Sequence, residues 1–218
     1  MDYIFFDNVS STQDFIKDRV IKGKVDSAVM AISQEVGRGR RDRKWYSPSG
    51  GLWFSFDVPY TSSLITIKIG VAVREACSEF YACKVLLKWP NDLILEGKKV
   101  GGIICEKVKD RVVIGIGINT NVEDIDVENS VSFLDVTSKV IENQDLMRKI
   151  IDKFVRFESE NIISEFRKHM AFIGEEKFVS AINKNAKIID ISDEGHLIIE
   201  DNGEIKNIFV GEILIDNN

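Results

Sequence analysis

Residues 34–48 read QEVGRGRRDRKWYSP and join two stretches typical of buried strands, SAVMAIS at 27–33 and GLWFSFDVP at 51–59. Four arginines and a lysine stand at positions 38–44 against the single carboxylate of Asp42, a local charge of +4 in a chain of net charge -6. Gly37 and Gly39 let the backbone bend, and guanidinium groups bind phosphate or carboxylate oxygens in pairs. The stretch predicts a flexible loop that closes over an anion, and Trp45 and Tyr46 offer rings for stacking.

The composition is that of an ordinary globular protein. Hydrophobic residues make up 44% of the 218 positions and charged residues 29%, which predicts one core of domain size and a small second module. No apolar run approaches the roughly 20 residues that span a bilayer, and the first residues lack the pattern of a secretory leader. We therefore expect a cytoplasmic protein without a membrane partner. Three cysteines at spacings that match no zinc or redox motif fit a reducing compartment.

Nucleic acid is not an expected partner. General binding to a phosphate backbone needs a broad basic surface, whereas here the net charge is negative and the cations gather in one short loop. Only about ten residues precede the first helix signal, too few for a module that reads DNA.

Periodicity outlines the elements around the loop. A strand is predicted at 3–6, a helix from Ser10–Thr12 to Gly23 and a second helix after 61–63. Strands follow at 85–90 and 111–122, on either side of a hairpin at 93–108. We expect mostly loop at 123–143 and a helical region at 144–170, with a break near Glu160 and Asn161.

The pattern changes near residue 172, where short alternating strands begin, separated by DEG and DNG turns. The sequence therefore predicts an α+β fold: a mixed central sheet with packed helices at 1–171 and a small β-barrel at 172–218.

Three further motifs place chemistry near the loop: KWPND at 88–92, KKVGGIICE at 98–106 and GIGIN at 115–119. Glycines in two neighbouring strands leave a slot for a flat or slender ligand. Simpler interpretations remain, since the basic loop fits a solvated charge run and Pro-Asn-Asp is common turn chemistry. No triad or metal-binding cluster stands out, so Mg²⁺, if required, would arrive with a nucleotide's phosphates.

Taken in order, SST at 10–12, the basic loop, KWPND, KVGGI at 99–103 and GIGIN resemble the biotin protein ligases, over nearly the whole chain. The likeness is to the short class, which lacks the N-terminal helix-turn-helix. It implies a class II synthetase-like biotin/lipoate ligase catalytic domain and an SH3-like C-terminal barrel. It also implies that biotin and ATP give biotinyl-5'-AMP and pyrophosphate, after which a lysine of a biotin carboxyl carrier protein takes the biotin.

The resemblance assigns residues to three roles. The catalytic set is Arg38, Arg40, Asp92 and Lys99, with Asp92 expected to meet the incoming lysine amine. The expected biotin-binding set is Ser11, Thr12, Gln34, Gly37, Arg38, Lys99, Gly102 and Gly115. The expected ATP-binding set is Arg38, Arg40, Arg43, Trp45, Asn91, Lys99 and Asn119. By the same resemblance the loop orders over the adenylate and excludes water.

This sequence departs from the family pattern at two positions next to these residues. Gln13 stands where asparagine is more usual, and Asp42 where glycine is common. Two other functions stay open: a lipoate or octanoate ligase of the same fold, and a protein that binds the adenylate without transferring it. The resemblance also allows a homodimer that pairs through the edge of the central sheet.

Overall fold

The computed structural model describes residues 1–157 and 162–215, apart from the side chain of Asp42. The break expected near Glu160 and Asn161 lies outside the described residues. No helix in the described part of the chain is long and apolar enough to cross a membrane.

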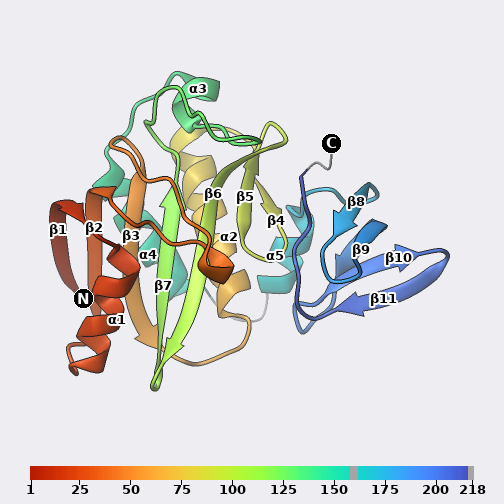
Figure 1. Cartoon of the computed structure of the whole chain (residues 1–218), viewed down its shortest axis with the longest axis horizontal. Helices are drawn as coiled ribbons and strands as arrows, with labels where there is room; N and C mark the ends of the chain where they lie inside the picture. Colours follow the sequence, from red (N-terminus) through yellow and green to blue (C-terminus); the bar gives the residue numbers. More distant parts are fainter. Residues whose placement is uncertain (158–161, 216–218) are drawn as a thin grey trace.

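A seven-stranded sheet forms the centre of the molecule, in the order β1-β2-β3-β7-β6-β5-β4 (Figure 1). Strands β1 and β2 run parallel, and each of the other neighbouring pairs is antiparallel. The bounds of the strands are Asp2–Val9 (β1), Ser27–Gln34 (β2), Leu52–Pro59 (β3), Leu86–Lys88 (β4), Asp92–Leu95 (β5), Lys98–Val108 (β6) and Arg111–Ile118 (β7). The predicted mixed sheet is thus confirmed.

Helices cover both faces of this sheet. Helix α1 (Thr12–Ile21) packs on one face, where Ile16 and Val20 meet Val29 and Val113. Helices α2 (Ile65–Tyr81) and α4 (Asn143–Arg156) pack on the other. Strand β3 has the alternation that this requires: Leu52, Phe54 and Phe56 join the α2 side, while Trp53, Ser55 and Asp57 point to the α1 side. Because both faces are covered, all six side chains are buried.

The expectation of mostly loop at 123–143 holds, with one short helix inside the range. Helix α3 (Phe133–Thr137) begins at Ser132, whose hydroxyl accepts from the Asp135 backbone while the Asp135 carboxylate accepts from Ser132. Five residues are too few to show a helical period, so only the capping pair announces this helix. Helix α5 (Ile162–Lys168) completes the helical region after α4.

The C-terminal strands form a separate antiparallel sheet in the order β11-β10-β9-β8. They span Glu176–Val179 (β8), Lys184–Ile191 (β9), Leu197–Asp201 (β10) and Glu204–Ile208 (β11), and they fit the predicted SH3-like module. Their apolar residues do not make a core alone. Ile188, Leu197 and Ile213 pack in one cluster with Leu87 and Trp89 of the larger part. This contact fixes the C-terminal segment beside the KWPND motif.

Candidate functional site

A cavity opens on the α1 face of the sheet, under the basic loop, and its floor is made of glycines. Gly102 of β6 pairs with Gly117 of β7, and Gly115 lies on the same face two residues earlier. A Cβ at Gly117 would lie 2.5 Å from the indole Nε1 of Trp45, and one at Gly102 would lie 3.1 Å from its ring. The two strands therefore form the predicted slot, and Trp45 lies in it.

One end of the cavity carries a cluster of uncharged hydrogen-bonding groups. The backbone N–H and hydroxyl of Thr12 are both 2.9 Å from Oε1 of Gln34, and the Thr12 hydroxyl is also 2.9 Å from that of Ser55. The amide nitrogen of Gln34 donates to Ser47 at 2.9 Å. Thr12 and Gln34, both expected to contact the ureido ring, thus lie side by side because α1 begins directly over β2 and β3.

Two residues of the expected biotin-binding set, Ser11 and Gly37, have structural roles. The Ser11 hydroxyl caps α1 by accepting from the Asp14 backbone N–H at 3.4 Å. Gly37 allows the loop to double back, because a Cβ there would lie 2.4 Å from both Ser47 Oγ and the Trp45 carbonyl. Neither lines the cavity in the described part of the chain. Their direct contact with biotin stays a prediction.

A buried carboxylate between two ammonium groups marks the middle of the site. Asp92 lies opposite Lys88 across the β4–β5 pair, and its two oxygens are 2.8 Å from Nζ of Lys88 and of Lys99. Burial would raise the pKa of Asp92, but the two ammonium groups hold it below its ordinary value. Burial also lowers the pKa of Lys99, more than Asp92 raises it.

Lys99 is therefore a partly desolvated cation. Its Nζ lies 5.0 Å from the centre of a Trp45 ring, within the range of a cation–π contact.

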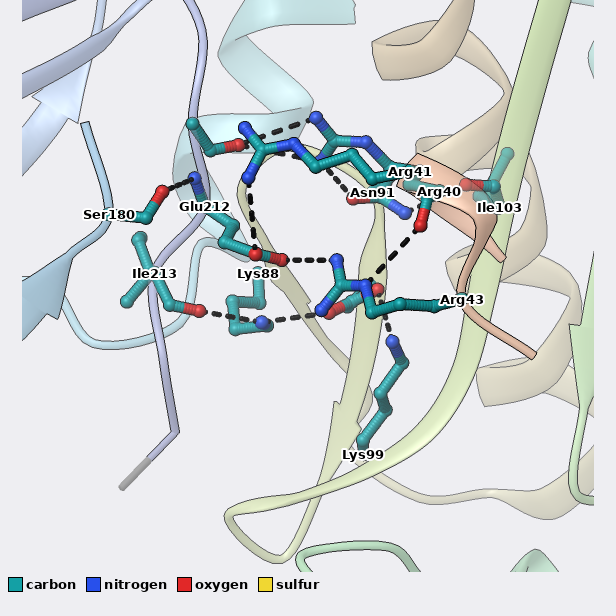
Figure 2. Close-up of polar contacts among 12 residues, drawn as sticks. Arg40, Arg41, Arg43, Lys88, Asn91, Lys99, Ile103, Ser180, Glu212 and Ile213 are labelled. Atoms are coloured by element: carbon teal, nitrogen blue, oxygen red, sulfur yellow. Dashed lines mark hydrogen bonds and ion pairs between the residues drawn. The ribbon is translucent and has the colours of Figure 1, made fainter. Parts of the chain in front are cut away.

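The arginines of the loop reach toward the C-terminal segment (Figure 2). Arg40, in a turn at Arg40–Asp42, donates to Asn91 Oδ1 at 2.9 Å and to the Gly211 carbonyl at 3.4 Å. Arg43 donates to Glu212 at 2.6 Å, and Arg41 lies 3.6 Å from the same carboxylate. Burial lowers the pKa of Arg40, with Glu212 acting in the opposite direction.

Two hydrogen bonds of the neighbouring backbone hold Glu212 in this position. Its backbone N–H donates to the Ser180 hydroxyl at 3.0 Å, and the next carbonyl, that of Ile213, accepts from Lys88 at 2.7 Å. Burial would raise the pKa of Glu212, but Arg43 above all lowers it, so the carboxylate is ionised. The C-terminal module thus places one negative charge inside the cavity that the basic loop covers.

Arg38 turns the other way, toward α1. It is 2.5 Å from the Asp14 carboxylate and 3.9 Å from Glu106, a residue of β6 that also pairs with Lys17 at 2.9 Å. Asn119, at the end of β7, donates to the Val131 carbonyl at 3.1 Å and stands at the wall of the cavity.

The remaining residues of the three sequence-based sets all line this one cavity: Thr12, Gln34, Arg38, Arg40, Arg43, Trp45, Asn91, Asp92, Lys99, Gly102, Gly115 and Asn119. Sequence reasoning did not assign Lys88, Glu106 or Glu212 to the site. Lys88 lies in the KWPND motif and Glu106 in KKVGGIICE, and the charge of each side chain could have indicated a place in the site. Glu212 had no such signal, since it is 169 positions from Arg43.

Known proteins are similar to this chain in sequence and in fold. Residues 5–121 match the model of the Biotin/lipoate A/B protein ligase family. The Bifunctional ligase/repressor BirA of Salmonella typhimurium is 32% identical over 94% of this chain and 71% of its own length. Among solved structures, the biotin protein ligase from Aquifex aeolicus in complex with biotin and ATP superposes with a TM-score of 0.86 at 29% identity, covering 98% of this chain and 97% of that one. The biotin protein ligase from Leishmania major in complex with biotinyl-5-AMP gives a TM-score of 0.69 at 25% identity, covering 96% and 99%.

Proposed function

The chain belongs to the biotin/lipoate A/B protein ligase family, and from that premise we propose how its glycine-floored cavity carries out the reaction. The activity is that of a biotin protein ligase: biotin and ATP give biotinyl-5'-AMP, and the biotin passes to a lysine of a biotin carboxyl carrier protein. The structural neighbours favour biotin over lipoate, because they are named as biotin protein ligases and hold biotin and ATP or biotinyl-5-AMP. Biotin and ATP are accordingly the substrates.

We assign the roles of these residues from one observation: a single cavity has an uncharged end and a cationic end. Thr12 and Gln34 supply hydrogen-bonding groups at the first, while Lys99, Arg40 and Arg43 supply cations at the second. A bicyclic urea with an apolar tail and a carboxylate matches this order of groups. Because Gly102 and Gly115 carry no side chain, Trp45 and Gln13 approach the strands closely there, and these four residues line the space assigned to the ring and tail.

In the first step a biotin carboxylate oxygen attacks the α-phosphorus of ATP, and pyrophosphate leaves. The two reactants repel each other, so cations must stand between them. We assign this to Lys99 and Arg40, because both are partly desolvated and desolvation strengthens their attraction for the developing charge. Arg38, Arg43, Trp45, Asn91 and Asn119 complete the expected nucleotide contacts around them.

In the second step the amine of the carrier lysine attacks the acyl carbon, and AMP leaves. The lysine arrives as an ammonium and must lose a proton first. Asp92 lies on the cavity wall with two cationic neighbours. Its lowered pKa keeps it ionised, so Asp92 can bind the incoming ammonium and accept its proton as the neutral amine attacks the acyl carbon. The glycine-punctuated loop closes over the adenylate and excludes water.

Magnesium supplies charge neutralisation to the phosphates of ATP when it is bound. No group of three His, Cys, Asp or Glu side chains gathers within residues 1–157 and 162–215 to hold it. Of the three carboxylates that line the cavity, Asp92 and Glu212 are already engaged by Lys and Arg, and Glu128 is exposed. An ion that enters on the nucleotide fits this donor set better than one held by the protein.

Three further expectations stay proposals. We place the boundary between the two modules at residues 171 and 172, we expect action in the cytoplasm without nucleic acid, and we expect two copies to pair through an edge of the central sheet. The reaction described above does not depend on any of these three proposals.

The test of the function uses the purified chain, ATP and a carrier domain with its acceptor lysine. We expect pyrophosphate release and an increase in carrier mass equal to one biotinyl group, with lipoate competing poorly. Preferential transfer of lipoate would contradict the biotin assignment. In Asp92→Asn we expect transfer to fall further than adenylate formation, and an equal loss in both steps would remove the role given to Asp92.

A further inference from the structure

A buried acceptor atom next to the biotin end of the cavity has no hydrogen-bond donor among the described residues. Gln13, the second residue of α1, is only 3% exposed and lines the cavity. Its amide nitrogen makes two hydrogen bonds, to Glu106 Oε2 at 2.8 Å and to the Val113 carbonyl at 3.2 Å. Its amide oxygen, Oε1, is buried and accepts no hydrogen bond from the described residues. An unmet acceptor of this kind is costly unless a ligand supplies a donor.

The orientation of the amide follows from its neighbours. A carboxylate and a backbone carbonyl can only accept, so the nitrogen of Gln13 must face Glu106 and Val113. The oxygen then faces the opposite way, over the glycine floor. A Cβ at Gly115 would lie 2.5 Å from Oε1, and it would meet Ser55 Oγ at 3.3 Å. Oε1 therefore lies beside the Thr12, Gln34 and Ser55 cluster.

Glu106 is suited to hold this arrangement. Lys17 lies 2.9 Å from Oε1 of Glu106, leaving Oε2 for Gln13, and Arg38 of the basic loop is 3.9 Å away. Burial would raise the pKa of Glu106, but Lys17, Gln13 and Arg38 together bring it below its ordinary value. The carboxylate is thus ionised and cannot donate to Gln13. A neutral amide in its place could donate and would allow the Gln13 side chain to turn over.

A cyclic urea carries two N–H donors and one carbonyl acceptor. Gln34 Oε1 already accepts hydrogen bonds from the backbone N–H and the hydroxyl of Thr12. Resting on the function proposed above, we propose that Gln13 is a specificity-determining residue whose Oε1 accepts one ureido N–H of biotin. Glu106 is the positioning residue that holds the Gln13 amide in the accepting orientation. The longer side chain at this position, where asparagine is more usual, spans from α1 to both β6 and the cavity.

The test compares biotin with its two isomers methylated at one ureido nitrogen, by calorimetric titration of the intact chain. We expect methylation at one of the nitrogens to weaken binding to the unmodified protein by roughly 10- to 100-fold. Gln13→Met keeps the length and volume of the side chain but has no acceptor oxygen. It should bind biotin weaker by a similar factor and discriminate against that methylated isomer by less than about 3-fold.

Glu106→Gln tests the positioning role. We expect it to lose part of the same discrimination, and the double variant to bind biotin no more weakly than Gln13→Met alone. Lys17→Met is the matched control, since it also removes a partner of Glu106 but leaves the bond to Gln13, and it should discriminate like the unmodified protein. Thermal melting establishes that each variant is folded.

Three outcomes overturn the proposal: full discrimination in Gln13→Met, additive losses in the double variant, or equal binding of biotin and both isomers by the unmodified protein. Should Gln13→Met fail to fold, Glu106→Gln decides, and unchanged discrimination there contradicts the positioning role. Failure of the unmodified protein to bind biotin at all would instead contradict the proposed function, so the two failures are distinguishable.

Discussion

Lys99 concentrates the electrostatics of the site in one side chain. It contacts Asp92 at 2.8 Å and Trp45 through a cation–π contact, and burial lowers its pKa. Such a partly desolvated cation interacts more strongly with a developing negative charge than an exposed one does. The effects expected of substitutions at Lys99 and at its partner Asp92 follow from this electrostatic environment.

We expect Lys99→Ala to slow adenylate formation by about 10²- to 10³-fold, because a preorganised charge at the carboxylate and phosphates is lost. The measurement is the rate of pyrophosphate release at saturating biotin and ATP. Lys98→Ala is the matched control, since Lys98 is the preceding residue and is exposed. A loss of only about 10-fold in Lys99→Ala would show that other groups stabilise the transition state.

Asp92→Asn should destabilise the fold in a pH-dependent way. The folded-state pKa of Asp92 is lowered, so its contribution is fully present above its unfolded value of about 4 and is lost as pH falls through the folded value. Removing the charge leaves Lys88 and Lys99 unpaired, which costs about 3–5 kcal/mol at neutral pH. Urea unfolding at a series of pH values should show the two proteins converging in acid. A pH-independent difference would contradict the ion-pair account.

Sequence reasoning at this scale succeeded where residues share a motif and failed where they meet only in space. KWPND contains both Lys88 and Asp92, which the β4–β5 pair brings together. Glu212 pairs with Arg43 only because the C-terminal module folds back, and no local pattern encodes that contact. The orphan oxygen of Gln13 likewise depends on Glu106, on another element.

Strands β6 and β7 form the slot because glycines stand where they pair. A methyl group at Gly117 would collide with Trp45, whereas one at Gly70 in α2 would make ordinary contacts at 3.6 Å or more. The absence of side chains here is therefore a requirement of the site and not of strand formation.

Gly117→Ala should expel Trp45 from the slot and weaken biotin binding by at least roughly 10-fold, as the rearranged indole obstructs the ring or tail. Tryptophan fluorescence in the absence of ligand and calorimetric titration with biotin measure the two effects. Gly70→Ala is the control and should change neither. Normal biotin affinity in Gly117→Ala would show that the ligand does not use this slot.

The basic loop is the second decisive element, and Glu212 holds it in place. We expect Glu212→Gln to speed hydrogen exchange of residues 38–44 in the ligand-free protein, because Arg41 and Arg43 lose a charged partner. Glu204→Gln removes an equivalent charge from the same module at an exposed position and should leave the loop unchanged. Unaltered exchange in Glu212→Gln would show that the loop is ordered by other contacts.

Periodicity predicted these elements well where they are long and amphipathic or alternate, as β3 and α2 do. It missed α3, which is short and is specified by a capping pair. It also located the basic loop but not the turn at Arg40–Asp42, where Arg41 adopts a left-handed backbone (φ 54°) that no arginine-rich pattern encodes.

The two modules share one of their cores. Ile188 and Leu197 of the small sheet pack with Leu87 and Trp89 of the large part, and the Trp89 indole donates to the Gly195 carbonyl at 3.0 Å. A small sheet of this size buries too little by itself to be stable. The sequence predicted the change of pattern near residue 172, but the shared core follows only from the packing.

Ile188→Ala should therefore destabilise the whole molecule by about 2–5 kcal/mol in a single transition. Far-UV circular dichroism and tryptophan fluorescence should report the same midpoint. Ile205→Ala, at a 64% exposed position of the same sheet, should stay within about 0.5 kcal/mol of the unmodified protein. Two separate transitions in Ile188→Ala would contradict a common core.

For the whole molecule, we propose that one cavity brings biotin and ATP together and retains the adenylate. The most direct measurement mixes the protein with biotin and ATP, without a carrier, and identifies the small molecules bound after rapid removal of free ligand. We expect biotinyl-5'-AMP bound to the protein, an equal amount of pyrophosphate released, and no adenylate in Lys99→Ala on the same timescale. Intact biotin and ATP with no adenylate in the unmodified protein would contradict it.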